Sequence, residues 1–413
     1  MKKYTVRFMT CCLLAFTLIF GLVPVQSVIL AQSDQKFKDV PKTFWASGAI
    51  NALSDKGFVG GYTDGTFRPN KTISRAEFTT MLVKISELTN AKQNPYKDVT
   101  GGWALHPVNV AYAAGLIPTS DFGNEFKPNQ NITRYEIARM ISKAMIKDQS
   151  YKEFFDIFSK LNNSDLPLTD SKSIQRGQIQ YVALTLGTGI MSGYNDQSIG
   201  LRNNATRAEA VAMLTSYYNS RSKKPEDYQY LKELKELAET GTNVKTVSKS
   251  VPMINIVDGK LFDFRTEKWI NSKLTLTHPN YTVKLKRMYL LPYNKNKKSL
   301  YEDKFIGKDK VIRKDYSGII VVVTDMTFNK DGGRLLFMQN LSLRNPARIT
   351  SSHPYEKFGI IHQYVSHHDY DFILKKGETK EITFYGYFDE ETFDTMDITG
   401  PYQNYILLRD SSR

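Results

Sequence analysis

The chain repeats part of its own sequence, and this repetition constrains the fold more than any other feature. The stretch GFVGGYTDGTFRPNKTISRAE at residues 57–77 has a counterpart, GLIPTSDFGNEFKPNQNITRYE, at residues 115–136. In both copies an aromatic residue lies eight positions before an arginine, and a tryptophan lies twelve positions before the first glycine. Self-similarity of this length is typical of repeat architectures, in which each unit buries its apolar face against its neighbours.

A third, more divergent copy extends over residues 168–221. It keeps the GIMSGY loop and the ATRAE box, but Gly177 stands where the tryptophan is expected, and Ile199 and Leu201 replace the aromatic residue and the proline. The arginines of the three boxes are separated by 59 and 73 residues, and the extra 14 residues match an insertion near residues 151–163.

Each copy is predicted to form a helix, a loop and a second helix. The second helix has the same N-terminal signal in all three copies: a serine or threonine followed three residues later by a glutamate, which is a capping box. These helix-capping residues are Ser74 and Glu77, Thr133 and Glu136, and Thr206 and Glu209. Apolar residues then recur at helical spacing, so we expect the three copies to pack around a common core.

The glycine–tyrosine loop followed by the arginine box resembles the S-layer homology family, and the resemblance covers residues 37–220. The family implies an all-α pseudo-trimer, with three prongs around a central helical bundle. It also implies that grooves between the repeats bind secondary cell wall polysaccharide, typically through a pyruvylated amino sugar. The resemblance places Arg75, Arg134 and Arg207 at these grooves, with Gly60, Gly61 and their counterparts beside them.

A physical argument supports this placement. Each arginine follows an N-cap, so it lies in a first helical turn, where N–H groups are unpaired and the helix dipole is positive. A carboxylate placed there would meet oriented donors and a guanidinium that binds it bidentately, while nearby aromatic faces would contact sugar rings. The candidate ligand-binding residues are Arg75, Arg134, Arg207, Gly60, Gly61, Tyr62, Asp64, Phe67, Trp45, Trp103, Ser192, Gly193 and Tyr194.

Simpler interpretations of the same residues stay open. The glutamates of the boxes are expected to cap helices rather than contact ligand, and Trp45 and Trp103 can instead anchor the first helices in the core. The arginines can be solvated surface charges, although three equivalent placements favour binding. Because the third copy has diverged most, Arg207 is expected to contribute less to binding than Arg75 or Arg134.

Residues 1–31 have the pattern of a secretory signal, with a basic start, an apolar stretch and small residues at the end. A retained membrane anchor is the alternative, because the apolar stretch is almost long enough to span a bilayer. Both cysteines, Cys11 and Cys12, lie in this segment, so the mature chain is predicted to form no disulfide. This pattern fits a secreted protein at the wall or S-layer of a Gram-positive bacterium.

Removing the three basic residues of the signal lowers the formal net charge from +14 to +11. A basic exported protein tends to meet an anionic partner. Nucleic acid, anionic lipid and an acidic wall polymer all satisfy that rule, and the family resemblance selects the polymer. We therefore predict an anionic polysaccharide attached to peptidoglycan as the partner, with no nucleic acid, no membrane span after signal cleavage and no cofactor.

The second half has a different pattern. Residues 225–240 are rich in helix formers and Gly241 can end a helix, which predicts a helical connector. Beyond residue 250, apolar and polar residues alternate, and Asp331-Gly332 separates two apolar runs as in a hairpin. We expect an independently folding all-β sandwich, loosely similar to immunoglobulin-like accessory domains of Gram-positive surface proteins. The predicted units are a signal peptide at 1–31, repeats at 36–94, 95–150 and 165–221, a connector at 222–245 and a β-sandwich at 250–413.

The sequence contains no recognisable nucleophile elbow, zinc-protease helix or phosphate loop, so we predict a non-enzymatic surface protein. Four histidines lie within 16 residues, at His353, His362, His367 and His368, but their spacing matches no metal motif and no metal site is predicted. The partner of the sandwich is not specified. The alternatives are a surface-anchored enzyme with an unrecognised active site and an S-layer lattice subunit.

Overall fold

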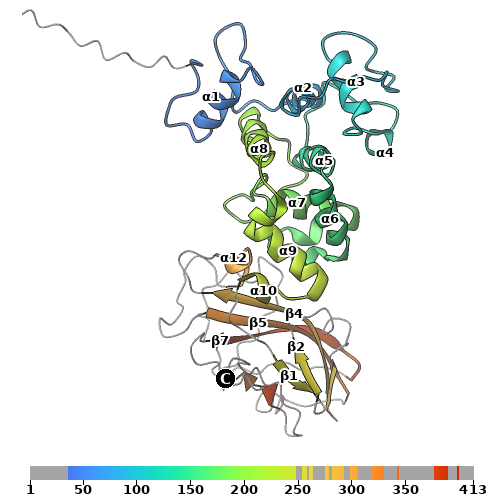
Figure 1. Cartoon of the computed structure of the whole chain (residues 1–413), viewed down its shortest axis with the longest axis vertical. Helices are drawn as coiled ribbons and strands as arrows, with labels where there is room; N and C mark the ends of the chain where they lie inside the picture. Colours follow the sequence, from blue (N-terminus) through green and yellow to red (C-terminus); the bar gives the residue numbers. More distant parts are fainter. Residues whose placement is uncertain are drawn as a thin grey trace, which may run out of the picture.

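The computed structural model describes residues 36–247 continuously and, beyond them, residues 254–257, 260–263, 275–278, 281–292, 298–305, 318–329, 342–343, 376–388 and 398–399. The molecule is elongated. Helices α1 to α5 and α8 lie toward one end and the strands at the other, with α6, α7 and α9 between them (Figure 1). The predicted signal segment, the Asp331-Gly332 turn and the histidine cluster at residues 353–368 lie outside the described residues.

Each repeat contributes two main helices, and the repeats are helical as predicted. The first helices are α1 (Ser47–Asp55), α3 (Leu105–Ala113) and α7 (Ile179–Gly187), and the second helices are α2 (Arg75–Ile85), α5 (Arg134–Met145) and α8 (Arg207–Ser220). At the start of each second helix the N-cap hydroxyl accepts a hydrogen bond from the glutamate amide, and the glutamate carboxylate accepts one from the N-cap amide. Each of these helices therefore begins at a complete capping box.

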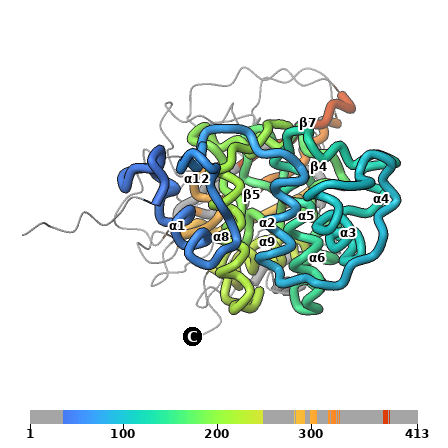
Figure 2. Tube along the Cα trace, turned by 90° about the horizontal axis from the view of Figure 1, so that it is seen from above, coloured from blue at the N-terminus to red at the C-terminus, as the bar shows by residue number. Residues whose placement is uncertain are grey.

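The second helices form the centre of the helical half, and each packs against the first helix of another segment, in cyclic order. Helix α2 packs against α3, α5 against α7, and α8 against α1, and α1 and α3 lie on opposite sides of α2 (Figure 2). The segments that enter these helices close a ring of backbone hydrogen bonds: Ile73 donates to Ala205 (3.1 Å), Ala205 to Ile132 (3.0 Å) and Ile132 to Ile73 (2.9 Å). The ring is fully buried and gives the three segments a pseudo-threefold arrangement.

The loops between the paired helices share one aspartate contact near their C-terminal end, including the loop of the divergent third segment. In each, an aspartate before the first helix accepts hydrogen bonds from two consecutive loop amides, and the second amide belongs to a residue with a left-handed backbone. These pairs are Asp39 with Arg68 (φ 58°), Asp98 with Lys127 (φ 55°) and Asp170 with Gly200 (φ 60°). The carboxylate stabilises a left-handed backbone conformation that residues other than glycine rarely adopt. This explains why the first two loops tolerate Arg68 and Lys127 at this position.

The insertion between the second and third segments builds a stalk toward the strands. It forms α6 (Gln149–Ile157) and the 3-10 turns η1 (Phe158–Lys160) and η2 (Asn163–Asp165), and α6 and η1 pack with α7 and with α9 (Gln229–Thr240). Helices α7 and α9 approach closely at Gly187, where a Cβ would lie 2.7 Å from a methyl group of Leu231. Gly241, with φ of 74°, ends α9 at the predicted residue.

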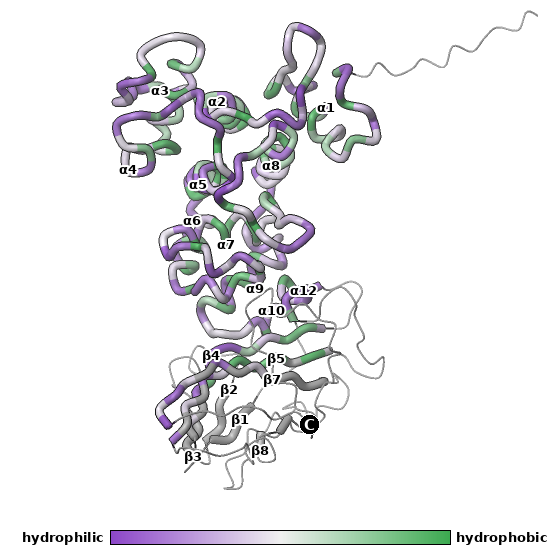
Figure 3. The backbone as a smooth tube through the Cα atoms, turned by 180° about the vertical axis from the view of Figure 1, so that it is seen from behind, coloured by the Kyte–Doolittle hydropathy of each residue, from purple (hydrophilic) through white to green (hydrophobic). Residues whose placement is uncertain are grey.

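The strands that the structure describes form one four-stranded antiparallel sheet and two short pairs. The sheet has the order β3 (Thr275–His278), β4 (Tyr281–Pro292), β5 (Gly318–Phe328) and β7 (Thr379–Phe388); the pairs are β1 (Ile254–Val257) with β2 (Lys260–Asp263) and β6 (Ser342–Leu343) with β8 (Ile398–Thr399). A register shift between Leu285 and Arg287 interrupts the β4–β5 ladder. Hydrophobic residues gather along α7 and strands β4 and β5 (Figure 3).

The described part of the second half also contains a short helix that the sequence did not predict. A short helix, α12 (Glu302–Phe305), packs on β4, where the Tyr289 ring lies 4.6 Å from the Tyr301 ring and 4.8 Å from the Phe305 ring. All three aromatic side chains are buried. These rings bury apolar area between α12 and β4, which holds the helix against the sheet. Within the described ranges, the immunoglobulin-like sandwich is not established.

Hydrogen bonds cross the boundary predicted near residue 250. The Met288 amide of β4 donates to the Gly241 carbonyl (3.0 Å). The buried Asn243 side chain accepts from the Leu290 amide (2.7 Å) and donates to the Leu290 carbonyl (3.1 Å). The segment after α9, which includes α10 (Val244–Val247), is therefore bonded to the sheet rather than separate from it.

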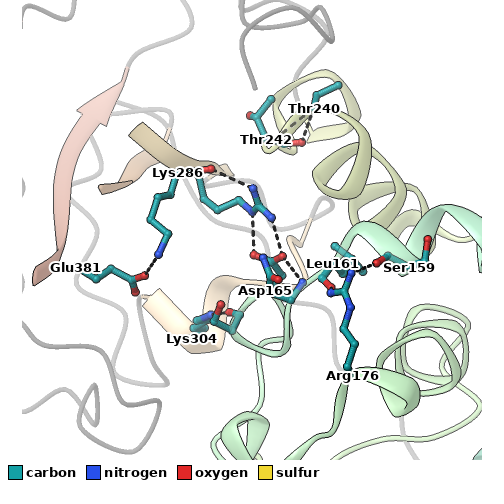
Figure 4. A network of polar contacts seen from close by, with 12 residues as sticks. Ser159, Leu161, Asp165, Arg176, Thr240, Thr242, Lys286, Lys304 and Glu381 are labelled. Atoms are coloured by element: carbon teal, nitrogen blue, oxygen red, sulfur yellow. Dashed lines mark hydrogen bonds and ion pairs between the residues drawn. The ribbon is translucent and has the colours of Figure 1, made fainter. Parts of the chain in front are cut away.

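Buried charged groups tie the same two halves together. Asp165 of η2 accepts two hydrogen bonds from the Arg287 guanidinium of β4, each at 2.8 Å, and the same guanidinium donates to the Lys286 carbonyl (3.1 Å; Figure 4). Glu233 of α9 accepts hydrogen bonds from Ser299 (2.7 Å) and Asn243 (3.1 Å). Burial raises the pKa of the Glu233 carboxyl to about 7, although these hydrogen bonds oppose the rise. The stalk and the sheet thus share a largely buried polar seam.

Candidate functional site

The three predicted arginines all lie at contacts between repeats. Each guanidinium extends from the start of its own second helix into the loop of another repeat and donates to backbone carbonyls there. Arg75 donates to Phe126 (2.9 Å); Arg134 donates to Ile199 (2.9 Å) and Ser192 (2.6 Å); Arg207 donates to Phe67 (2.9 Å) and Gly60 (3.0 Å). We name these contacts the Arg75, Arg134 and Arg207 junctions. Loops 1, 2 and 3 are the loops between the paired helices of the first, second and third segments. The Arg75 junction joins segment 1 to loop 2, the Arg134 junction joins segment 2 to loop 3, and the Arg207 junction joins segment 3 to loop 1.

Each guanidinium also meets the capping glutamate of the repeat that it enters. The distances are 2.5 Å for Arg75 and Glu136, 3.5 Å for Arg134 and Glu209, and 3.4 Å for Arg207 and Glu77. The capping glutamates therefore have two roles, because each completes its own helix start and neutralises an arginine from another repeat. The pairing is cyclic, like the backbone ring beneath it.

The first-turn amides are already occupied, so the predicted unpaired N–H donors are absent from these helix starts. In α8, the Arg207 amide donates to Lys71 (2.9 Å), the Ala208 amide to Pro69 (3.0 Å) and the Glu209 amide to the Thr206 hydroxyl (3.2 Å). Equivalent bonds occupy the first three amides of α2 and α5. Carbonyls of the neighbouring loop accept the hydrogen bonds that a carboxylate ligand was expected to accept. The residue pattern at a single helix start does not reveal this.

The arginines are also buried rather than solvated, with exposures of 9% for Arg75, 4% for Arg134 and 4% for Arg207. Carbonyls and carboxylates of the chain itself accept hydrogen bonds or ion pairs from all three guanidinium groups, so none of the three is a free bidentate donor. Phe67 is fully buried and offers no face to a sugar ring, which corrects its predicted role. Its ring is packed under Arg207, 4.7 Å from the guanidinium carbon.

The loop of repeat 1 is a tight turn that exposes its glycines. The Tyr62 amide donates to the Thr66 carbonyl (2.7 Å), and Asp64 accepts from the amide and hydroxyl of Thr66 (3.0 and 2.6 Å). A Cβ on Gly61 would lie 2.5 Å from the Phe37 ring, whereas Gly60 has open space around it. Gly61 is thus required by packing, and Gly60 leaves room beside its Arg207-bound carbonyl.

Loop 3 closely matches loop 1. The Tyr194 amide donates to Ser198 (2.8 Å), as Tyr62 does to Thr66, and Gly193 approaches the Ser198 carbonyl as Gly61 approaches Thr66. The Tyr194 ring lies 4.5 Å from the Arg134 guanidinium. The loop around Arg134 therefore matches the loop around Arg207: each has a glycine followed by a tyrosine. Ser192 stands in the place of Gly60.

Loop 2 is built differently and changes the Arg75 junction. One turn of helix, α4 (Thr119–Phe122), replaces the tight turn, and the Phe122 ring lies 5.2 Å from Arg75 and 4.9 Å from Arg139. Asp121 is held by Lys143 (2.5 Å) and Arg139 (3.3 Å). Among the described residues, the Nε of Arg75 has no hydrogen-bond partner, unlike the Nε of the other two arginines.

The tryptophans are exposed, at 64% for Trp45 and 62% for Trp103, so they do not anchor the core. Their role as sugar platforms stays a prediction. Two residues that sequence reasoning missed, Arg68 and Lys71, surround Tyr62: the Arg68 guanidinium lies 3.9 Å and the Lys71 amine 5.3 Å from the ring centre. The available signal was the pair of cations between the aromatic residue and the arginine box of copy 1. Copy 2 keeps a cation at the first of these positions only, and copy 3 at neither.

The S-layer homology domain model matches residues 36–79 and 95–138, the two segments that carry the tryptophans and the first two arginine boxes. The chain contains S-layer homology domains. Such domains attach proteins to the cell surface, so this is a secreted cell-surface protein, as the sequence predicts. Among the described residues, no helix combines the length and apolar character needed to cross a membrane.

Curated relatives resemble this chain over part of its length. It is 32% identical over 203 residues to the Amylopullulanase of Thermoanaerobacterium thermosulfurigenes, covering 48% of this chain and 10% of the relative. It is 36% identical over 117 residues to the Cellulosome-anchoring protein of Acetivibrio thermocellus, covering 26% of each. It is 28% identical over 228 residues to the S-layer protein EA1 of Bacillus anthracis, covering 53% of this chain and 25% of the relative. The chain thus spans about a quarter or less of these relatives.

Proposed function

We propose that this protein anchors itself non-covalently to the cell wall by binding a secondary wall polysaccharide at the junctions between its S-layer homology repeats. We also infer that residues 165–221 form a third repeat of the family. The observation that carries both proposals is the cyclic exchange: Arg207 enters the loop of repeat 1 just as Arg134 enters loop 3, beside an exposed glycine and a tyrosine. Clustered aromatic and polar groups at such loops suit sugar recognition.

The remaining part of the proposal concerns the second half. We infer that the sheet domain, with an immunoglobulin-like architecture, is displayed outward from the wall of a Gram-positive bacterium. The stalk and the Asp165–Arg287 contact support a display with a fixed orientation, because a bonded seam leaves less freedom than a flexible linker. The polymer is expected to carry acidic groups, in keeping with the formal net charge of +14.

The purified chain should co-sediment with peptidoglycan that retains its polysaccharide. Stripping the polysaccharide from the same walls with hydrofluoric acid should lower the bound fraction by roughly tenfold or more, equivalent to about 1.4 kcal/mol of binding free energy. An unrelated protein of the same net charge serves as the control for simple charge attraction. Equal binding of the chain to intact and stripped walls would reject polysaccharide recognition.

Several relatives are named as glycosidases, which keeps a surface-anchored enzyme as the second candidate. Their matches cover half of this chain or less, so we propose that the protein itself is non-enzymatic. Incubation with pullulan, xylan and carboxymethylcellulose should release no reducing sugar above a heat-inactivated control. Release from any of the three polymers would establish the enzyme instead. An S-layer lattice subunit is the third candidate, and concentration-dependent assembly would favour it.

A further inference from the structure

More positive charge surrounds Tyr62 than surrounds its counterpart Tyr194, where Arg134 is the one cation found over the ring among the described residues. Three cations lie against the Tyr62 ring: Arg68 at 3.9 Å, Arg207 at 5.0 Å and Lys71 at 5.3 Å from the ring centre. The Lys71 amine also donates to the Tyr62 hydroxyl (3.4 Å). An electron-rich ring attracts cations through its quadrupole, so this tyrosine holds the side chains of two exposed loop residues in place.

The charges around Tyr62 do not all cancel. Asp64 pairs with Arg68 (2.9 Å), and Glu77 lies 3.4 Å from Arg207 and accepts the Tyr62 hydroxyl at 3.5 Å. Hydrogen bonds from Thr66 and Arg68 hold the pKa of the Asp64 carboxyl well below its usual range, so that it stays ionised. Among the described residues, no carboxylate lies within 4.0 Å of the Lys71 amine, and Lys71 is exposed.

Neither of the other loops repeats this cluster. In loop 3, Gly200 stands in the place of Arg68 and Asn203 in the place of Lys71, and Gly200 packs so closely that a Cβ there would lie 2.5 Å from the Tyr194 ring. In loop 2, Lys127 keeps the left-handed position of Arg68, but the tyrosine and the second cation are replaced by Ser120 and Gln130.

We propose that Tyr62, Arg68 and Lys71 form the site that recognises an acidic group on the wall polymer, and that each chain holds one such site, at the Arg207 junction. The inference rests on the proposed function and deepens it. Lys71 supplies an uncompensated charge, Arg68 a planar donor and Tyr62 a partly exposed ring, and Gly60 of the same loop has open space around it. The buried Arg207 positions the loop, and the exposed cations contact the sugar-borne carboxylate or phosphate.

Titration calorimetry of the full chain with small probes tests this site. The probes are a pyruvylated N-acetylhexosamine methyl glycoside, the 6-phosphate of the same sugar and the uncharged parent. Lys71→Gln should weaken binding of the preferred anionic probe by about tenfold, and the Arg68→Asn/Lys71→Gln double variant by up to about a hundredfold. Neither should change binding of the uncharged parent. The preferred anionic probe identifies the acidic group as carboxylate or phosphate.

Lys127→Asn is the matched control, because it removes a cation from the same left-handed position in loop 2 and should leave binding unchanged. Lys71→Gln keeps the Lys71 backbone carbonyl that accepts from Arg207, so its melting temperature should match that of the unsubstituted chain. Equal affinities for the three proteins, or an equal loss with Lys127→Asn, overturn the site. Co-sedimentation with intact walls but equal binding of charged and uncharged probes rejects this inference alone; failure to co-sediment rejects the proposed function.

Discussion

Replacing Arg207 by alanine should destabilise the helical half by about 3–5 kcal/mol, because the change leaves a partner charge and two carbonyls without their donor. The Arg207 side chain is 5% exposed and binds the carbonyls of Gly60 and Phe67 as well as Glu77. Urea unfolding followed by circular dichroism at 222 nm measures the loss. Lysine at this position should recover only part of it, because an amine lacks the planar fork.

Arg202→Ala is the control for Arg207→Ala, because Arg202 lies on the adjacent loop but is exposed. It should change the free energy of unfolding by no more than about 0.5 kcal/mol. If both variants unfold at the same urea concentration, Arg207 is not a structural tie between repeats. If the prediction holds, loss of wall binding by Arg207→Ala reports damage to the loop, and Lys71→Gln is the better test of ligand contact.

Replacing Arg287 by methionine should cost about 3–5 kcal/mol, because it leaves Asp165 buried without its countercharge. Asp165 is 3% exposed in this pair and Arg287 is 17% exposed, and both hydrogen bonds between them measure 2.8 Å. The unfolding of the sheet should then separate from that of the helices in differential scanning calorimetry, since this pair joins the stalk to β4.

Two further variants check the Asp165–Arg287 contact. Asp165→Asn combined with Arg287→Met should recover part of the loss, because the buried charge is removed along with its partner. Lys286→Met removes the neighbouring cation, which pairs with Glu381 (2.6 Å) at the edge of the same sheet and is 38% exposed (Figure 4). Its effect should stay within about 1 kcal/mol. A Lys286→Met loss as large as that of Arg287→Met would contradict the special weight given to the buried pair.

The family resemblance and the repeat spacing predicted the helical half well and placed the three arginines at grooves between the repeats, but they did not predict which loop each arginine enters. The structure pairs Arg207 with Gly60 and Phe67 of repeat 1. The lower rank of Arg207 rests on the divergence of its own repeat rather than of the loop that it enters, and it stays a prediction. The divergent loop is loop 2, which faces Arg75. No local pattern reveals this exchange, because it depends on which repeat lies next to which around the central ring.

In the second half, the sequence predicted individual strands but not the contacts between distant segments. Alternation at residues 281–285 and a continuous β-branched run at residues 318–323 predicted strands, and both segments lie in strands. These patterns did not predict α12 or the seam, because Asn243 and Leu290 are far apart in sequence and their side-chain bonds carry no periodic signal. The boundary near residue 250 was drawn where the pattern changes, and that is not where the contacts end.

The sequence by itself determined the local elements of this protein: the capping boxes at Ser74, Thr133 and Thr206, the helices that follow them, and a family resemblance that two domain matches confirm. These follow from near-neighbour hydrogen bonding and periodic burial, which a short window contains. Only the tertiary structure decided which loop each arginine enters, that the helix-start amides are occupied, and that Lys71 lies beside Tyr62. These depend on long-range packing, where the free energy of burying a charge selects the partner that can satisfy it.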